Sequence, residues 1–285
     1  MPPEVPAARP VVALEGVTKR YANGTLAVRG VDLAIDQGDF VSLLGPSGCG
    51  KSTVLRMVAG LISPTTGRIA LAGESAGDIG FVFQEPTLMP WGTTLKNVML
   101  PLRLAGVPRS EAEARAAAAL ASVGLAGFEQ SYPRGLSGGM KMRVSIARAL
   151  VTKPRLLLMD EPFGALDEIT RHRLNNDLLS LWEDERFTAI FVTHSVFESV
   201  YLSRRIIVMA ARPGRVVEDL AVEAPYPRAM TPAGFLIASA EDMTHYLIAQ
   251  LNGGQYQENR VLSAPGLAQL HAAGASVGRS AAYAM

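Results

Sequence analysis

The sequence predicts an α/β protein built around a mainly parallel sheet. A compact run at residues 40–44, apolar except for Ser42, leads directly into a glycine-rich loop at residues 45–53, and a second apolar run at residues 156–159 is followed by two acidic residues. Short apolar runs of this kind are typical of parallel strands that are buried on both faces. Strand-like and helix-like segments alternate around both runs, which is the rhythm of a layered α/β core.

The remaining elements follow from local patterns. Before residue 90 we expect strands at residues 11–21, 28–35, 40–44, 68–72 and 79–84, and a helix at residues 52–60. A mainly helical insertion should occupy about residues 90–150, with one helix from Thr94 that Pro101 bends and a second from Ser110. After it we expect strands at residues 155–160, 188–193 and 206–210, and helices at residues 170–185, 195–202 and 233–251.

Composition limits the possible functions. The 285 residues carry a net charge of +1, so the chain lacks the basic excess that marks nucleic-acid binding. A single cysteine, Cys49, excludes an internal disulfide and fits a reducing compartment. No apolar stretch approaches the roughly 18 residues that a membrane-spanning helix needs, and residues 1–10 do not resemble a secretory signal. We therefore expect a cytosolic protein that reaches a membrane only through a partner.

The glycine-rich loop predicts a nucleotide triphosphate site. It follows a strand, precedes a helix and has two spaced glycines before a Lys-Ser pair, which is the phosphate-loop pattern. Glycines let successive N–H groups point at phosphate oxygens, and the helix adds its positive end. Lys51 should reach the β- and γ-phosphates, Ser52 should ligate Mg²⁺, and Thr53 should lie on the α-phosphate side. The nucleotide-binding residues are Gly45, Pro46, Ser47, Gly48, Cys49, Gly50, Lys51, Ser52 and Thr53.

The second apolar run predicts the metal and water side of the same site. Asp160 is placed to hold Mg²⁺, and Glu161 to orient or deprotonate the attacking water. Apolar runs that end in Asp-Glu also occur as ordinary strand-to-turn junctions. The glycine-rich loop upstream is what favours the catalytic interpretation.

A third segment, Leu136-Ser137-Gly138-Gly139, predicts another phosphate-binding turn. Ser137 can cap the helix that follows, and the two glycines leave its backbone N–H groups open to an anion. Because residues 45–53 already hold the phosphates, a second grip in one chain has a use only over the nucleotide of a neighbouring subunit.

In this order, the three segments together with Gln84, Asp167 and His194 resemble the nucleotide-binding subunit of an ATP-binding-cassette transporter over roughly residues 11–220. The resemblance implies a P-loop NTPase core with an N-terminal antiparallel β-subdomain and a helical signature subdomain. It also implies that Gln84 touches Mg²⁺ and the attacking water, and that His194 contacts the γ-phosphate. Three further roles are implied. Ser137, Gly138 and Gly139 would cap the γ-phosphate of the other subunit, and Asp167 would belong to a loop that crosses the dimer interface. Tyr21 would stack on adenine, unless it is an ordinary strand aromatic.

The resemblance implies an ATPase domain at residues 11–220, with its helical subdomain at about 90–150, after a tail at residues 1–10. Local patterns predict a helical appendage at 221–252, and a composition rich in Ala, Gly and Ser predicts a flexible tail at 253–285. The sequence departs from the family pattern at Met140 and Met142, where glutamine is common. Neither side chain is expected to donate to phosphate, so activity is not in question.

Three stretches, residues 85–91, 136–143 and 211–216, resemble the nitrate, sulfonate and taurine importer branch, although Gly92 stands where an apolar residue is more usual. The branch implies a homodimer with two Mg-ATP, two permease subunits docking near residues 84–91, and indirectly a periplasmic solute-binding protein. The subunit would be a peripheral protein on the cytoplasmic face of the bacterial inner membrane. Exposed Met89 and Trp91 would suit a permease helix, unless Trp91 only packs within the insertion. The alternatives are a lipid or efflux system and a cassette ATPase that acts on nucleic acid or ribosomes.

Overall fold

The computed structural model describes residues 10–72 and 79–222, together with four strands of two residues each. The chain separates into two units, Met1–Pro227 and Arg228–Met285, and every expected site residue belongs to the first. In the second unit β10 (Gln255–Tyr256) pairs with β11 (Asn259–Arg260), and β12 (Ala275–Ser276) with β13 (Ala282–Tyr283), both antiparallel. The helix expected at residues 233–251 and, those strands apart, the tail expected at 253–285 lie outside the described residues.

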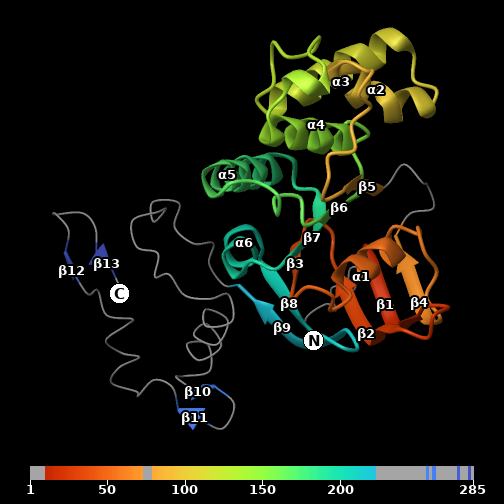
Figure 1. Cartoon of the computed structure of the whole chain (residues 1–285), viewed down its shortest axis with the longest axis vertical. Coiled ribbons are helices and arrows are strands. Elements are labelled where there is room, and N and C mark those ends of the chain that lie inside the picture. The colour runs from red at the N-terminus through yellow and green to blue at the C-terminus, as the bar shows by residue number, and fades with distance from the viewer. Residues whose placement is uncertain are drawn as a thin grey trace, which may run out of the picture. The chain divides into compact units, whose positions relative to one another are not determined.

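A six-stranded sheet in the order β5-β6-β7-β3-β8-β9 forms the centre of the first unit (Figure 1). Its strands are β5 (Ile79–Val82), β6 (Leu156–Asp160), β7 (Thr188–Thr193), β3 (Phe40–Leu44), β8 (Arg205–Ala210) and β9 (Arg215–Ala221). The first five are parallel and β9 is antiparallel to β8. Every residue of β3, β6 and β7 is buried, as their apolar sequences predict. Parallel pairing brings the carboxyl ends of β3 and β6 to one edge of the sheet, and the site lies there.

A three-stranded antiparallel sheet, β2-β1-β4, packs beside the central sheet. It consists of β1 (Val12–Arg20), β2 (Leu26–Ile35) and β4 (Thr66–Leu71). Helix α1 (Lys51–Val58) lies between the two sheets, and its buried Val54 and Leu55 join one apolar cluster with residues of both. The cluster holds the glycine-rich loop against a rigid support, and the antiparallel subdomain is confirmed.

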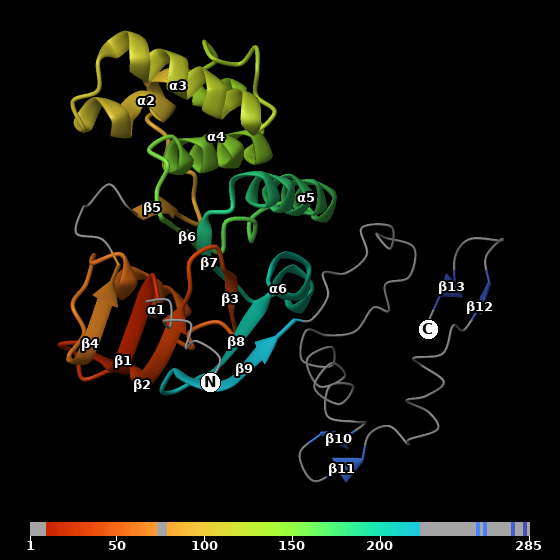
Figure 2. The ribbon, with the colours of Figure 1, turned by 180° about the vertical axis from the view of Figure 1, so that it is seen from behind.

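The expected helical insertion is also confirmed, and Figure 2 shows its helices gathered at one end of the unit. They are α2 (Thr94–Leu104), α3 (Arg109–Ser122), the short 3-10 turn η2 (Pro133–Gly135) and α4 (Gly138–Leu150). Thr93 caps α2 by accepting from the backbone N–H of Lys96, and the helix continues through Pro101 to Leu104. Small buried residues, Ala112 and Ala116, let α3 pack closely against its neighbours.

Two further helices, α5 (Glu168–Glu185) and α6 (Val196–Leu202), complete the described part of the unit. Phe40 of β3 packs against Trp182 of α5 edge to face, with ring centroids 5.8 Å apart, which fixes α5 on the sheet. Within residues 10–72 and 79–222, none of the helices has the length and low charge required to cross a bilayer.

Candidate active site

A cleft of about 810 Å³ opens where the glycine-rich loop meets the end of β6. Its walls contain most of the expected triphosphate residues and three of the four residues expected to act in catalysis, of which Lys51 belongs to both sets. The lining residues are Thr25, Leu26, Ala27, Ser47, Gly48, Gly50, Lys51, Ser52, Thr53, Gln84, Glu161, Arg212 and Pro213. The structure therefore brings Gln84, from the end of β5, to the residues that α1 and β6 supply.

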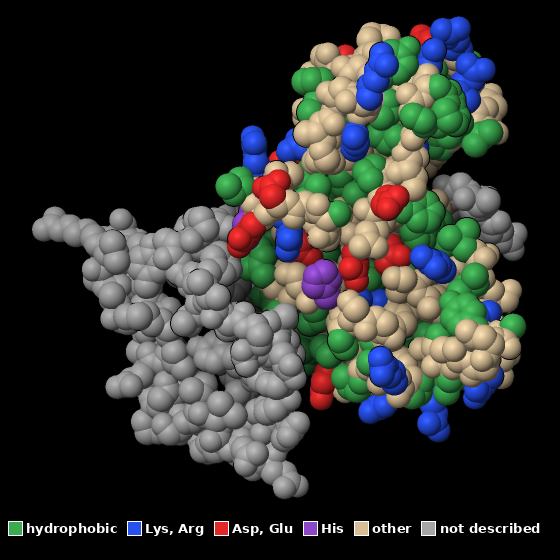
Figure 3. Space-filling view, viewed as in Figure 1, with side chains coloured by type: hydrophobic (Ala, Val, Ile, Leu, Met, Phe, Trp, Pro, Cys, Tyr) green, Lys and Arg blue, Asp and Glu red, His purple; other side chains and the backbone are tan. Residues whose placement is uncertain are grey.

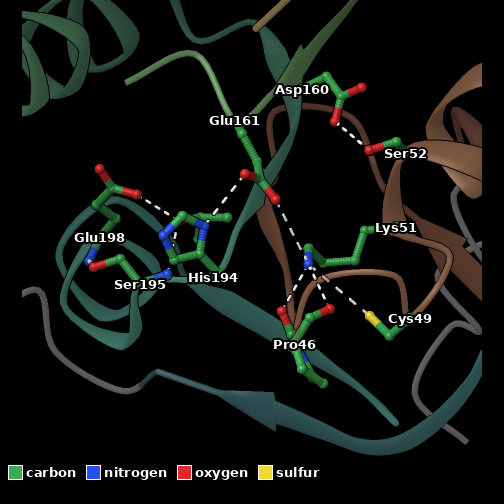
Figure 4. A network of polar contacts seen from close by, with 11 residues as sticks. Pro46, Cys49, Lys51, Ser52, Asp160, Glu161, His194, Ser195 and Glu198 are labelled. Carbon is green, nitrogen blue, oxygen red and sulfur yellow. Dashed lines mark hydrogen bonds and ion pairs between the residues drawn. The ribbon is translucent and has the colours of Figure 1, made fainter. Parts of the chain in front are cut away.

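Lys51 is buried at the start of α1, and its ammonium is held by the loop itself (Figure 4). Its Nζ donates to the carbonyls of Gly45 at 2.6 Å and Pro46 at 3.1 Å, and lies 3.7 Å from Oε1 of Glu161. The loop can curl this tightly because Gly48 and Gly50 have φ angles of 76° and 93°, which residues other than glycine rarely adopt. The result is a fixed cation facing a carboxylate across the cleft.

Asp160, at the end of β6, contacts Ser52, the residue that follows Lys51 on α1 (Figure 4). The Ser52 hydroxyl donates to Oδ1 of Asp160 at 2.6 Å, although 108 residues separate them in the chain. Burial raises the pKa of the Asp160 carboxyl, and the Ser52 hydrogen bond opposes that rise. With the Gln84 amide, these groups offer hydroxyl, carboxylate and amide oxygens, which is a donor set that suits Mg²⁺. The described ranges contain no group of three His, Cys, Asp or Glu side chains that would hold a metal alone, so phosphate and water would complete the shell.

The carboxylate of Glu161 lies between the Lys51 ammonium and the ring of His194. Its φ of 46° is uncommon for a residue with a side chain, and its N–H donates to the carbonyl of Val192 at 3.0 Å. This backbone turn directs the carboxylate into the cleft, where Oε1 faces Lys51 and Oε2 lies 3.2 Å from Nδ1 of His194. The His194 side chain is half exposed, so it can contact both Glu161 and a bound molecule.

A ring of hydrogen bonds holds the backbone around His194 in place. The Thr193 hydroxyl donates to the buried carboxylate of Glu198, and the N–H of Ser195 donates to the Thr193 hydroxyl at 3.0 Å. The N–H of Glu198 donates in turn to the Ser195 hydroxyl at 3.3 Å. Burial raises the pKa of Glu198, a residue that was not among those expected from the sequence. Glu198 lies in the first turn of α6, which begins two residues after His194.

Tyr21 lies just beyond the end of β1, with its hydroxyl 3.3 Å from that of Thr53. The ring is 37% exposed and so does not belong to the core, which speaks against an ordinary packing role. Stacking on adenine remains a prediction.

The phosphate-binding turn at residues 136–139, called the signature turn below, and Asp167 do not line this cleft. Ser137 caps α4 by accepting from the N–H of Met140 at 3.2 Å, as expected. Ser137 and Gly139 line a separate hollow of about 350 Å³ together with α5 residues such as Thr170 and Leu174. Asp167 caps α5 by accepting from Thr170 at 2.9 Å, and backbone hydrogen bonds to its carboxylate lower its pKa.

A second wall of the cleft was not expected from the sequence. Arg212 and Pro213 line it from the turn between β8 and β9. Gly214 seats that turn against the glycine-rich loop, because a Cβ at this position would lie 2.0 Å from the carbonyl oxygen of Cys49. Residues 211–216 resemble an importer branch, but no local pattern in them predicts a position beside the nucleotide phosphates.

Two side chains near the site differ in accessibility from their neighbours. The Cys49 thiol is fully buried, and burial raises its pKa. Met89 was expected to be exposed like Trp91, but it is half-buried because its side chain packs over Gly92. Trp91 itself is 76% exposed, so it does not pack within the insertion.

Charged side chains of both signs lie on the face of the described residues that Figure 3 shows. On the face in Figure 3, lysine and arginine side chains are scattered, and acidic side chains lie among them near the middle. This agrees with the net charge of +1 and gives no support to a nucleic-acid interface on that face.

The fold and the cleft define a P-loop ATPase with an antiparallel β-subdomain and a helical signature subdomain. The family model described as ABC transporter matches residues 28–164. The chain is 47% identical over 230 residues to an uncharacterized ABC transporter ATP-binding protein, MJ0412, of Methanocaldococcus jannaschii, covering 78% of this chain and 86% of the relative. The chain belongs to the ABC transporter ATP-binding proteins, and it is an ATPase that hydrolyses ATP to power transport.

Other relatives and solved structures agree with this assignment. The aliphatic sulfonates import ATP-binding protein SsuB of Rhodopseudomonas palustris is 44% identical over 230 residues, covering 80% of each chain. A dimeric structure of the cassette MJ0796, bound to ADP and Pi after hydrolysis, superposes with a TM-score of 0.66 at 35% identity and covers 75% of this chain and 99% of that one. The structure of cbiO1 from Clostridium perfringens, part of the transporter complex cbiONQ, gives a TM-score of 0.69 at 27% identity, covering 75% and 90%.

Proposed function

We propose that two copies of the chain close head to tail over two ATP molecules and that this closure drives a separate permease which imports a small anionic solute. The observation that carries the proposal is the separation of the two phosphate-binding segments. Lys51, Ser52 and Glu161 line one cleft, whereas Ser137 and Gly139 line another hollow of the same chain. A second copy would supply the missing turn, and the dimeric cassette MJ0796 is a precedent in a 35% identical relative.

The chemistry proposed for the cleft is transfer of the γ-phosphoryl group of ATP to water. Lys51 would neutralise the β- and γ-phosphates, and the N–H groups at the start of α1 would surround them. Ser52, Asp160 and Gln84 would hold Mg²⁺, which would supply positive charge to the triphosphate when bound.

Glu161 and His194 would handle the attacking water. The Glu161 carboxylate is held between Lys51 and His194, so it can accept a hydrogen bond from a water placed in line with the γ-phosphate. His194 would orient that carboxylate through Nδ1 and contact the γ-phosphate with the rest of its half-exposed ring. Ser137, Gly138 and Gly139 of the second copy would present the N-terminus of α4 to the same phosphate.

The solute class rests on the relatives. SsuB proteins from several bacteria are 42–44% identical to the chain, and their names give aliphatic sulfonates as the imported solutes. An anion of the nitrate, sulfonate or taurine type is therefore the proposed cargo. The permease pair would dock near residues 84–91, where Trp91 projects from the surface.

The test is to purify the tagged chain with the membrane subunits that accompany it and reconstitute the complex in lipid nanodiscs. The proposal predicts a pair of permease subunits for two copies of the chain, and ATPase activity that rises when a solute-binding protein loaded with a sulfonate is added. Co-purification with ribosomal RNA or DNA, or stimulation by lipid substrates alone, would contradict it.

A further inference from the structure

The segment between β5 and α2 has no helix or strand of its own, yet side chains fix it at several points. We call residues 86–93 the docking loop, because Trp91 projects from it and is 76% exposed. A loop with so few backbone partners would ordinarily be mobile. Here two polar side chains from the helical subdomain hold its carbonyl groups.

Arg148, on α4, holds the first part of the docking loop. Its Nη1 donates to the carbonyl of Thr87 at 2.9 Å, and its Nη2 donates to the carbonyl of Pro86 at 2.9 Å and to the Thr87 hydroxyl at 3.0 Å. A guanidinium presents its five N–H donors in a rigid planar fork, whereas a lysine presents three donors from one nitrogen at the end of a flexible chain, so lysine would not reproduce this set of hydrogen bonds in full. Burial lowers the pKa of Arg148, but an arginine remains charged, so these are charge-assisted hydrogen bonds.

Asn97, on α2, holds the second part. Its amide is fully buried, and Oδ1 accepts from the N–H of Met89 at 2.7 Å. Nδ2 lies within donating distance of three carbonyls, those of Met89 and Gly92 at 3.2 Å each and that of Thr93 at 3.0 Å. A Cβ at Gly92 would come within 3.3 Å of Nδ2, so the loop is wrapped tightly around this amide.

Both holding residues belong to the subdomain that carries the signature turn. Arg148 lies on the same helix, α4, that begins beside Ser137, and Leu88 packs against an apolar cluster to which α2, α3 and α4 contribute together with the central sheet. At its other end, the docking loop is two residues from Gln84, which lines the nucleotide cleft. The loop is thus fastened to one subdomain while its neighbour in the chain faces the nucleotide.

We propose that Arg148 and Asn97 are positioning residues that fasten the docking loop to the helical subdomain, so that Trp91 moves with α4 as one rigid surface. The inference rests on the proposed function for its consequence: movement of the signature turn at ATP binding reaches a docked permease through a loop that cannot absorb it. Neither residue lines the nucleotide cleft, so each acts on coupling and not on phosphoryl transfer itself.

The first test uses the isolated chain and hydrogen–deuterium exchange of the docking loop. Arg148→Met and Asn97→Ala should each raise the exchange rate of the Met89 and Gly92 amides at least tenfold, and the remainder of the helical subdomain should keep its protection. Arg148→Lys should give an intermediate rate. Arg115→Met is the matched control, because Arg115 donates to the carbonyl of Val151, three residues beyond Arg148, and not to the loop. Unchanged exchange in Arg148→Met and Asn97→Ala would overturn the inference.

The second test uses the nanodisc complex and the ratio of its ATPase rate to that of the isolated chain. Arg148→Met should lower that ratio several-fold, with Arg148→Lys partly restoring it, while the KM for ATP stays at the wild-type value. Arg115→Met should keep the wild-type ratio. A wild-type ratio of one would contradict the proposed function, and the exchange result would then decide the positioning role by itself. A wild-type ratio retained in Arg148→Met would refute the role in coupling.

Discussion

Replacing Gly214 by alanine should damage the nucleotide site from outside it. The added Cβ would lie 2.0 Å from the carbonyl oxygen of Cys49 and 2.8 Å from that of Ala27. Carbon contacts are optimal at about 3.5–4.0 Å, so the turn and the glycine-rich loop would have to separate by about 1.5 Å. Both opposing atoms are backbone, so no side chain can rotate away to relieve the contact.

The separation would also weaken two hydrogen bonds. The N–H of Gly214 donates to the carbonyl of Ala27 at 3.0 Å, and the N–H of Arg29 donates to the carbonyl of Gly214 at 2.8 Å. Overpacking of this kind costs about 1–3 kcal/mol, and each weakened hydrogen bond adds about 0.5–1.5 kcal/mol. We expect a loss of about 3 kcal/mol in the free energy of unfolding, together with a higher Kd for ATP, because the glycine-rich loop itself moves.

Urea unfolding and calorimetric titration with ATP would measure both effects. Gly135→Ala is the matched control, since a Cβ there meets nothing within 4 Å and its φ is not positive. If Gly214→Ala unfolds at the same urea concentration as Gly135→Ala and binds ATP equally well, the close approach of the turn to the loop is not a structural requirement and the reasoning fails.

Two further predictions concern carboxylates. Glu161→Gln should still bind ATP but hydrolyse it at least a hundredfold more slowly, because the amide cannot accept the proton of the attacking water; near wild-type turnover in a steady-state phosphate-release assay would remove Glu161 from this role. Burial raises the pKa of Glu198, so the folded chain binds that proton more tightly than the unfolded chain, and the stability that Glu198 contributes falls as the pH rises from about 4.3 through the folded pKa. Glu198→Gln should therefore gain stability relative to wild type as the pH rises from 4 to 7, and a difference in melting temperature that is the same at both pH values would contradict this.

Short continuous segments made much of the site predictable. The residues of the glycine-rich loop are adjacent in the chain. The strands β3 and β6 are buried on both faces, so their sequences are almost entirely apolar and could be recognised as strands. Strand β9 was not predicted, because most of its residues are exposed at the sheet edge and it has no apolar run. Met89 was placed wrongly because its exposure depends on how the chain turns around Asn97, which no local pattern encodes.

Contacts between distant segments account for what the sequence alone could not reveal. Gly214 lies against the carbonyl of Cys49, more than 160 residues earlier in the chain. Arg148 donates a hydrogen bond to the carbonyl of Thr87, 61 residues earlier. Such pairs follow from the sheet order and the packing of α4, which appear only when the elements are assembled. The resemblance to a transporter subunit supplied roles for Gln84 and His194, and the structure supplied the position of one in the nucleotide cleft and of the other beside Glu161.

The central claim is that the hydrolytic centre needs a second copy of the chain. The most direct measurement is the mass of the Glu161→Gln variant with Mg-ATP by light scattering, beside Glu161→Gln combined with Ser137→Arg. We predict a dimer that retains ATP for the first variant and an ATP-bound monomer of 30.3 kDa for the second, because Ser137 does not line the chain's own nucleotide cleft. A stable ATP-bound monomer of the Glu161→Gln variant, or a dimer that forms despite Ser137→Arg, would contradict the claim.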